Sequence, residues 1–275
     1  MIEKPGTLVT ISPVLEATHL TKRYARLSGT LYSSGGPSFA AVDDVSLAVE
    51  PGETLAIVGE SGCGKTTLAR MLLRLIEPDS GQLRFEGNDL LGLSGEAMRQ
   101  RRRQMQMIFQ DPFASLNPRM RIGDIVGEPL AIHEPGLSNA EKRERTEAML
   151  VRVGLAADAA RLYAHEFSGG QRQRIGIARA LILHPKLVVA DEPVSALDVS
   201  IGAQILLLLE ELQQEFGLTY IFISHSLPVV AQVATRIAVM RAGKFLEVGP
   251  AEAVLRQPEQ PYTRELLAAV PTPPA

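Results

Sequence analysis

The sequence GESGCGKTT, residues 59–67, decides the fold. It fits the pattern G-x-x-x-x-G-K-[ST] and lies between a short apolar run, residues 55–58, and a stretch at residues 65–76 that predicts a helix. Glycines let the backbone turn its N–H groups inward, and the following helix adds the positive end of its dipole. The segment therefore predicts a phosphate-binding loop between a strand and a helix.

Side chains of this loop add a charge and a metal ligand. Lys65 supplies a positive charge for the β- and γ-phosphates of a nucleotide, and the Thr66 hydroxyl is a hard oxygen ligand for Mg²⁺. The residues expected to contact the nucleotide are Gly59, Glu60, Ser61, Gly62, Cys63, Gly64, Lys65, Thr66 and Thr67.

Cys63 is the single cysteine, so this chain alone builds no disulfide, zinc cluster or iron–sulfur cluster. Two interpretations of it stay open. The loop tolerates a small side chain there, or the helix N-terminus lowers the pKa of the thiol and makes it reactive. In the second case alkylation of Cys63 would block activity, and bound nucleotide would protect it.

The overall composition is that of an ordinary globular protein. The 275 residues are 45% hydrophobic and 21% charged, with a formal net charge of −3 and a pI near 6.0. This balance does not favour a nucleic-acid binder. Residues 218–235 are weakly charged but too polar for a membrane span, and the sequence MIEKPGTLVT at the start has no signal-peptide core. We expect a cytoplasmic chain that meets a membrane only through a partner.

Short strands and helices alternate along the chain. Residues 42–58 predict strand, turn and strand, residues 187–190 a buried strand, residues 201–215 a helix and residues 218–224 another strand. Residues 112–165 mix apolar and charged residues at helical spacing, which predicts an inserted helical subdomain. This alternation predicts an α/β fold with a mostly parallel sheet and helices on both faces.

Residues 96–104 predict a charged helix that carries Arg99, Arg101, Arg102 and Arg103. A solvated helix face is one interpretation, and a phosphate-binding patch is the other.

Two adjacent carboxylates follow the buried strand LVVA, residues 187–190. At the carboxyl end of a parallel strand they lie at the ligand edge of the sheet. We expect Asp191 to hold Mg²⁺ and Glu192 to act as general base on the attacking water. A solvated pair in a loop is the alternative, and the apolar strand together with the phosphate loop favours catalysis.

Two further polar side chains also follow predicted strands. His225 comes after IFIS and Gln110 comes after MIF. At the same sheet edge His225 can contact the γ-phosphate, and Gln110 can reach Mg²⁺ and the water.

The segment HEFSGGQRQRIGIARAL, residues 165–181, predicts a helix with Ser168 as its N-cap. Alone, SGGQ is compatible with any glycine turn that caps a helix. In order with the phosphate loop, Gln110, Asp191-Glu192 and His225, it closely resembles the signature of ATP-binding cassette (ABC) ATPases. The resemblance covers residues 14–250.

The resemblance implies a P-loop NTPase (RecA-like) core with a mostly parallel sheet, an antiparallel β subdomain and an inserted α-helical subdomain at about residues 112–180. Residues 14–250 would form the ATPase domain and residues 251–275 a short C-terminal tail.

Individual roles follow from the same resemblance. Residues 59–67 match the Walker A loop, Gln110 the Q-loop, residues 187–191 the Walker B strand, Glu192 the catalytic glutamate, Asp198 the D-loop and His225 the switch histidine. The implied metal contacts are Thr66, Gln110 and Asp191, with ATP and Mg²⁺ as cofactors. Tyr24 best matches the aromatic residue that stacks on adenine, with Phe39 or Tyr32 as alternatives.

ABC ATPases work as pairs, and the chain has one set of each motif. The signature residues Ser168, Gly169, Gly170 and Gln171 would contact the γ-phosphate held by a second ATPase subunit, identical or related. Two departures are visible: Phe167 stands where Leu is commoner, and Ser226 where Asp is commoner. Neither removes a group expected to touch phosphate or metal.

Three segments resemble the dipeptide and oligopeptide importer ATPases: FQDPFASLNPRM, ADEPVSALDVS and QPEQPYTRELLAAVP. This resemblance implies two transmembrane permease subunits, an extracytoplasmic solute-binding protein, no nucleic acid, and a place on the cytoplasmic face of the inner membrane. The alternatives are nickel or another small solute as cargo, or a non-transport ABC ATPase.

Overall fold

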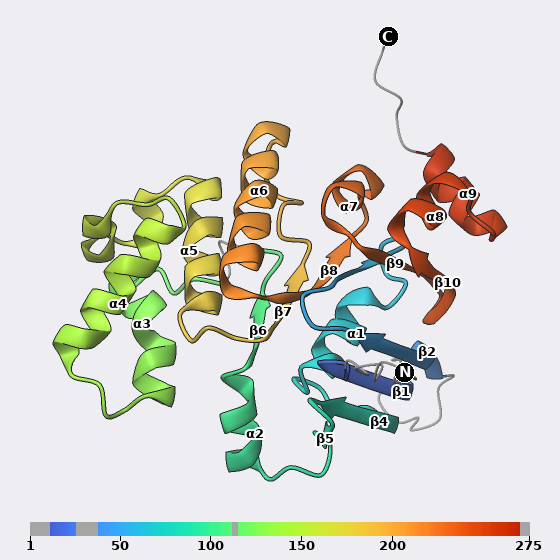
Figure 1. The fold of residues 1–275 in the computed structure, drawn as a ribbon, viewed down its shortest axis with the longest axis horizontal. Helices are drawn as coiled ribbons and strands as arrows, with labels where there is room; N and C mark the ends of the chain where they lie inside the picture. The colour runs from blue at the N-terminus through green and yellow to red at the C-terminus, as the bar shows by residue number, and fades with distance from the viewer. Residues whose placement is uncertain (1–11, 26–37, 112–114, 270–275) are drawn as a thin grey trace, which may run out of the picture.

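The computed structural model describes residues 12–25, 38–111 and 115–269. A six-stranded sheet with strand order β10-β9-β3-β8-β7-β6 lies at the centre (Figure 1). Its strands are β3 (Thr54–Val58), β6 (Met105–Ile108), β7 (Leu187–Asp191), β8 (Thr219–Ser224), β9 (Arg236–Arg241) and β10 (Lys244–Pro250). Strands β9, β3, β8, β7 and β6 run parallel, and β10 is antiparallel to β9.

A second sheet of four antiparallel strands, in the order β2-β1-β4-β5, lies beside the first. Its strands are β1 (Leu15–Ala25), β2 (Ser38–Val49), β4 (Ser80–Phe85) and β5 (Asn88–Asp89). The α-helices are α1 (Lys65–Leu72), α2 (Gly95–Arg102), α3 (Ile122–His133), α4 (Asn139–Arg152), α5 (Gly169–Leu181), α6 (Val199–Phe216), α7 (Leu227–Val233), α8 (Ala251–Arg256) and α9 (Pro261–Ala268). Short 3₁₀ turns η1 (Ala157–Arg161) and η2 (Ala164–Glu166) precede α5.

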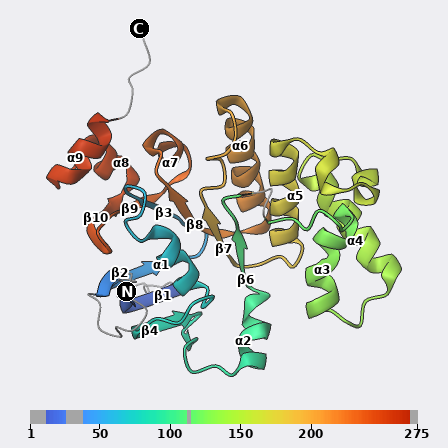
Figure 2. The same cartoon turned by 180° about the vertical axis from the view of Figure 1, so that it is seen from behind.

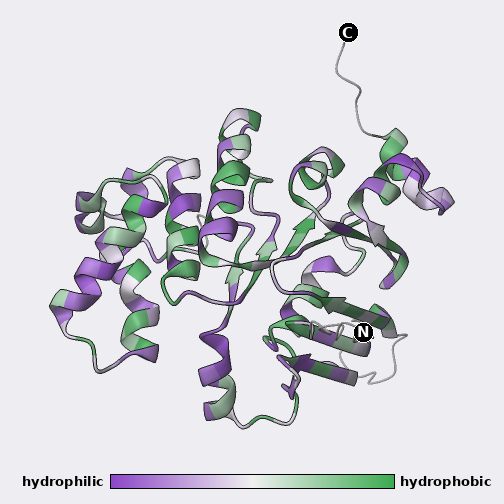
Figure 3. Cartoon of the chain, in the orientation of Figure 1, coloured by the Kyte–Doolittle hydropathy of each residue, from purple (hydrophilic) through white to green (hydrophobic). Residues whose placement is uncertain are grey.

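Side chains of β3 alternate between two hydrophobic cores, one on each face of the central sheet. Leu55 and Ile57 pack into the core shared with α1 and the antiparallel sheet, whereas Ala56 and Val58 pack into the core shared with α5 and α6. A parallel strand buried on both faces reads as a continuous apolar run, as β3, β7 and β8 do. Figure 3 shows hydrophobic colouring along the central strands and hydrophilic colouring along α2.

Helices α3 and α4 form an arm at one end of the molecule, on the far side of α5 from the sheet (Figure 1). The view from behind in Figure 2 shows the same arrangement, with α8 and α9 at the opposite end. The arm has its own apolar contacts, because Ile125, Leu130 and Leu150 are buried against α5.

The predicted α/β fold with a mostly parallel sheet is confirmed. The helix predicted at residues 65–76 is shorter, because α1 ends at Leu72 and Arg74 adopts a left-handed φ of 49°. Arg74 N–H donates to the Met71 carbonyl and Leu75 N–H to the Arg70 carbonyl, the bonds of a Schellman cap. The Arg74 side chain donates to the carbonyls of Leu90 and Leu93, which explains an arginine where glycine is usual.

The arginines around α2 favour the solvated helix face over the phosphate patch. Arg99 pairs with Glu96, and Arg103 pairs with Glu134 of the arm. Arg102 donates to the Arg74 carbonyl. The carboxylates of Glu96 and Glu134 thus already neutralise Arg99 and Arg103, which a phosphate would otherwise need.

Some sequence predictions fall on residues outside those described: Tyr32 as an alternative adenine-stacking residue, residues 112–114 of the segment FQDPFASLNPRM, and residues 270–275 of the predicted tail. Within the described part of the chain, every helix is too short or too polar to cross a bilayer.

Candidate active site

Four strands of the central sheet deliver polar residues to one edge. The register pairs Val58 with Ser224 and Ile108 with Ala190, so the segments after these parallel strands leave the sheet side by side. The predicted site residues at this edge are Gly59, Gln110, Asp191, Glu192 and His225.

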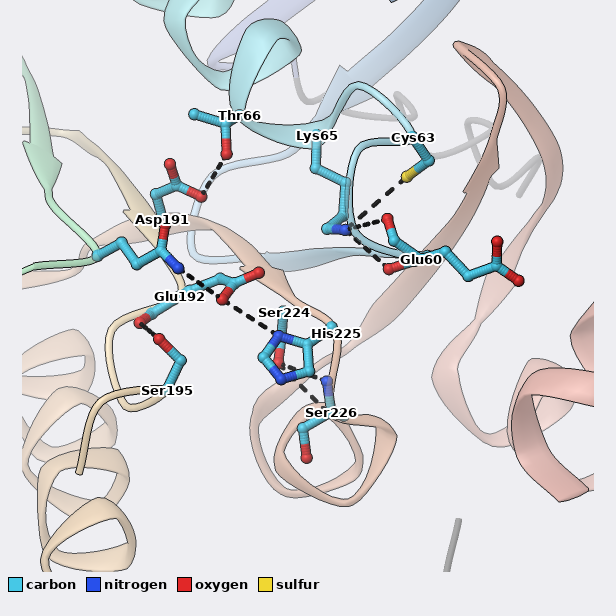
Figure 4. A network of polar contacts seen from close by, with 12 residues as sticks. Glu60, Cys63, Lys65, Thr66, Asp191, Glu192, Ser195, Ser224, His225 and Ser226 are labelled. Carbon is cyan, nitrogen blue, oxygen red and sulfur yellow. Dashed lines mark hydrogen bonds and ion pairs between the residues drawn. The ribbon is translucent and has the colours of Figure 1, made fainter. Parts of the chain in front are cut away.

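Lys65 lies inside the phosphate loop and is 5% exposed. Its Nζ donates hydrogen bonds to the Gly59 carbonyl at 2.7 Å and the Glu60 carbonyl at 2.8 Å (Figure 4). A buried ammonium group needs such partners. The two carbonyls therefore hold the ammonium group inside the loop.

The loop needs glycine at two positions. Gly59 has φ 154°, and a Cβ there would lie 2.1 Å from the Met240 carbonyl oxygen. Gly64 has φ 114°, and a Cβ there would lie 2.0 Å from the Ala41 carbonyl oxygen. Backbone from two other strands thus packs against the loop, which fixes its curvature.

Asp191 ends β7 and is 3% exposed. The Thr66 hydroxyl donates to Asp191 Oδ1 at 3.3 Å (Figure 4). Burial raises the pKa of Asp191, the bond from Thr66 lowers it, and the neighbouring Glu192 charge raises it further. The net result is a raised pKa, so the ionised form of Asp191 is less favourable here than in water.

Glu192 contacts the two other polar residues at the carboxyl ends of the strands, Gln110 and His225. Its Oε2 accepts a hydrogen bond from Gln110 Nε2 at 3.0 Å and lies 3.1 Å from His225 Nδ1. The Glu192 backbone has φ 47°, a left-handed value rare for a side chain with a Cβ. Both the N–H and the hydroxyl of Ser195 donate to the Glu192 carbonyl, which holds this turn.

A cavity of about 610 Å³ opens over these groups, within the size range of small-molecule sites. Among the predicted residues it is lined by Tyr24, Ser61, Gly62, Gly64, Lys65, Thr66, Thr67, Gln110, Glu192 and His225. Cys63 and Asp191 lie behind this lining, since both are buried.

Two aromatic rings stand at the mouth of the cavity. Tyr24 and Phe39 are cross-strand neighbours of β1 and β2, with ring centroids 6.0 Å apart and exposures of 38% and 46%. Both line the cavity. The choice of Tyr24 as the adenine-stacking residue stays a prediction, and the geometry makes Phe39 its equal. The pairing across β1 and β2 was missed because β1 was not predicted as a strand.

Of the two interpretations of Cys63, the structure favours a tolerated small side chain over a reactive thiol. Cys63 is 8% exposed. Burial raises the pKa of its thiol, and the charge of Lys65 only partly opposes the rise. The helix N-terminus therefore does not set the pKa of this thiol, because the Cys63 side chain lies in the core beneath α1.

The signature residues lie outside the cavity lining. Ser168 is the N-cap of α5, as predicted: its Oγ accepts from Gln171 N–H, and Gln171 Oε1 accepts from Ser168 N–H. A Cβ on Gly170 would lie 2.4 Å from Ile201 Cγ2 of α6. Asp198 caps α6. The hydrogen bond from the Ile201 N–H is the main cause that lowers the pKa of Asp198, and the bond from the Ser200 hydroxyl lowers it further.

The sequence matches the family described as "ABC transporter" over residues 42–195. It is 51% identical to a putative peptide import ATP-binding protein of Brucella ovis, over 96% of this chain and 81% of the relative. It is 53% identical to the oligopeptide transport ATP-binding protein OppF of Salmonella typhimurium, over 85% of this chain and 70% of the relative.

Two solved structures share the fold. A dimeric, post-hydrolysis structure of the ATP-binding cassette MJ0796 with ADP and Pi superposes with a TM-score of 0.75 at 28% identity, over 86% of this chain and 98% of that one. CbiO1 of Clostridium perfringens, part of the ABC transporter complex CbiONQ, also gives 0.75, at 27% identity, over 90% of this chain and 92% of that one.

Proposed function

The chain belongs to the ABC transporter family, and we propose that it is the ATP-binding and hydrolysing subunit of an importer for di- or oligopeptides. Relatives named for peptide import cover most of its length and support this cargo. The ATPase residues do not touch the solute, so the cargo rests on those relatives alone.

One observation carries the ATPase role: the cavity holds a buried lysine and a carboxylate with two polar partners on the same oxygen. Lys65 would exchange its loop carbonyls for the β- and γ-phosphate oxygens. Glu192 would accept the proton of the attacking water at Oε2. Gln110 and His225, which already contact that oxygen, would orient it.

The oxygen donors around Asp191 fit Mg²⁺. The Thr66 hydroxyl and the Asp191 carboxylate lie 3.3 Å apart, and Gln110 adds an amide oxygen nearby. These hard ligands are few, as is usual where phosphate oxygens and water complete the shell. When bound, the ion would neutralise charge that develops on the phosphates.

We propose that a second ATPase subunit completes the site. The signature residues 168–171 lie outside this chain's own cavity lining. A head-to-tail pair would bring them to the γ-phosphate held by the other subunit. The structural neighbour MJ0796 is dimeric, which supports such a pair. Residues 14–250 would form the ATPase domain and residues 251–275 its tail.

Permease subunits would anchor the chain at the cytoplasmic face of the membrane, with an extracytoplasmic solute-binding protein as a further partner. A groove of about 250 Å³ between α2, β6 and α3 supports a docking place. Leu75, Phe109 and Ile132 line it and are each more than 40% exposed. Phe109 directly precedes Gln110, so a permease helix bound in this groove would be coupled to movements of Gln110 in the nucleotide site.

Reconstitution tests this proposal. The chain would be assembled in liposomes with the permease, binding-protein and ATPase candidates encoded beside it. We expect phosphate release to rise when peptide is supplied, and to stay at its basal rate with Ni²⁺. Stimulation by Ni²⁺ instead would reassign the cargo. No ATP hydrolysis in any combination would refute the ATPase role itself.

A further inference from the structure

The C-terminal helix α9 reaches the phosphate loop through one side chain. The backbone N–H of Glu60 donates a hydrogen bond to Tyr262 Oη at 3.3 Å. Tyr262 is 4% exposed, and burial raises the pKa of its hydroxyl. The group is therefore a neutral phenol at physiological pH, able to accept this bond.

The same peptide unit is held from its other side by Lys65. Its carbonyl belongs to Gly59 and accepts from Lys65 Nζ at 2.7 Å, whereas its N–H belongs to Glu60. With a triphosphate bound, the ammonium group of Lys65 would turn toward the phosphate oxygens. The bond to Tyr262 does not involve Lys65, so it would persist through this exchange.

This peptide unit needs an external hold because glycine precedes it. Gly59 has φ 154°, a region open to glycine, so the unit rotates more easily than one between two residues with side chains. A stiffer residue cannot replace the glycine, since its Cβ would meet the Met240 carbonyl at 2.1 Å. Contacts from elsewhere must supply the rigidity.

The strands β9 and β10 support Tyr262 and the loop together. The Arg241 guanidinium lies over the Tyr262 ring, 4.4 Å from its centroid. The Gly243 N–H donates to the Cys63 carbonyl at 2.9 Å. The part of the loop that precedes α1 is thus held at two points: Tyr262 bonds to Glu60, and the β9–β10 turn bonds to Cys63.

Glu247 of β10 fastens the start of α9. Its carboxylate accepts from the N–H groups of Glu259 at 2.9 Å and Gln260 at 3.1 Å, and from the Thr263 hydroxyl at 2.6 Å. Burial alone would raise the pKa of Glu247, but these hydrogen bonds together lower it. An ionised carboxylate therefore fixes the helix that carries Tyr262.

We propose that Tyr262 is a positioning residue for the nucleotide site: its hydroxyl holds the peptide unit between Gly59 and Glu60 in the orientation that binds phosphate. The C-terminal tail would then contribute to ATP affinity without touching ATP. This inference rests on the proposed function, because it concerns the same loop.

Tyr262→Phe tests it, because the change removes the hydroxyl and keeps the ring over Arg241. We expect ATP affinity of the full chain, measured by calorimetry with EDTA to prevent hydrolysis, to fall about 3- to 10-fold, the effect of one hydrogen bond. The Glu60 amide should also exchange with solvent faster in ¹⁵N-resolved hydrogen exchange. A purely structural role of the ring would move neither quantity.

Tyr220→Phe is the matched control, since it removes another buried phenol hydroxyl whose hydrogen bond goes to the Leu209 carbonyl of α6 and not to the phosphate loop. Its ATP affinity should stay within twofold of the unchanged chain. Unaltered ATP affinity in Tyr262→Phe, or an equal loss in both variants, would overturn the inference. Absence of ATP binding by the unchanged chain would instead overturn the proposed function.

Discussion

Two helix N-termini in this chain carry residue types that suit phosphate, and they differ in what already occupies them. α1 begins after Gly64, and among the described residues no side chain caps it. α5 begins after Ser168, and a capping box with Gln171 satisfies the N–H groups of Ser168 and Gln171. The first terminus faces a cavity in its own chain. The second lies outside the lining of that cavity.

This difference suggests different roles for the two termini: α1 binds the nucleotide, and α5 completes a site that another molecule presents. Uncapped N–H groups at α1 gain a partner when a phosphate arrives, so this terminus can bind a nucleotide alone. At α5 a phosphate must compete with Ser168 for the Gln171 N–H, and this terminus lies outside the cavity that the chain's own phosphate loop lines. The second terminus therefore suits a role that begins only when another molecule presents the phosphate.

The largest expected effect is on turnover. Glu192→Gln should lower phosphate release by roughly 10²- to 10⁴-fold, the contribution of a general base, and leave ATP affinity nearly unchanged. Phosphate release and calorimetric binding of ATP measure the two quantities. Normal turnover in this variant would move the base to another residue.

The next effect is on binding at α1. Lys65→Ala should weaken ATP binding by roughly 10- to 100-fold, as expected for hydrogen bonds from a charged group. Lys186→Ala is the control, since Lys186 is paired with Glu86 away from the cavity. Equal affinities of the two variants for ATP in equilibrium dialysis would refute the role of α1.

Ser168→Ala probes the second terminus, and Ser138→Ala is its match, because Ser138 caps α4 through the same kind of box with Glu141. Each should lower the melting temperature by roughly 2–4 °C, the effect of about 1 kcal/mol in a chain of this size. Only Ser168→Ala should also lower the turnover of the assembled pair, roughly tenfold. Equal turnover in both variants would make the second terminus purely structural.

The smallest effect concerns stability. The raised pKa of Asp191 means that the folded chain binds this proton more tightly than the unfolded chain does. Stability therefore falls as pH rises through that pKa, and the ionised group is unfavourable at neutral pH. Asp191→Asn should raise the melting temperature without nucleotide by roughly 2–4 °C at pH 7, less at pH 4. Calorimetric scans at both pH values test the sign.

The loop at residues 59–67 and the strand before Asp191 were predictable because their signals are local. Glycine spacing and an apolar run need no partner to be recognised. The contact of Tyr262 with Glu60 joins residues 202 positions apart, and no local pattern encodes it. The burial of Cys63 and the early end of α1 also depend on groups from other elements. These are the core side chains under α1 and the backbone carbonyls of Leu90 and Leu93.

Gly170 shows how packing and ligand contact can both require a small residue at one position. The methyl group of Ile201 occupies the space that any larger residue would need, whether or not a nucleotide is ever bound. A mutational scan scored for folding alone would thus already register a cost for larger residues at this position, because Ile201 would have to move to admit them. Intolerance there does not demonstrate contact with a ligand, and only a scan scored for folding and for turnover separately can divide the two demands.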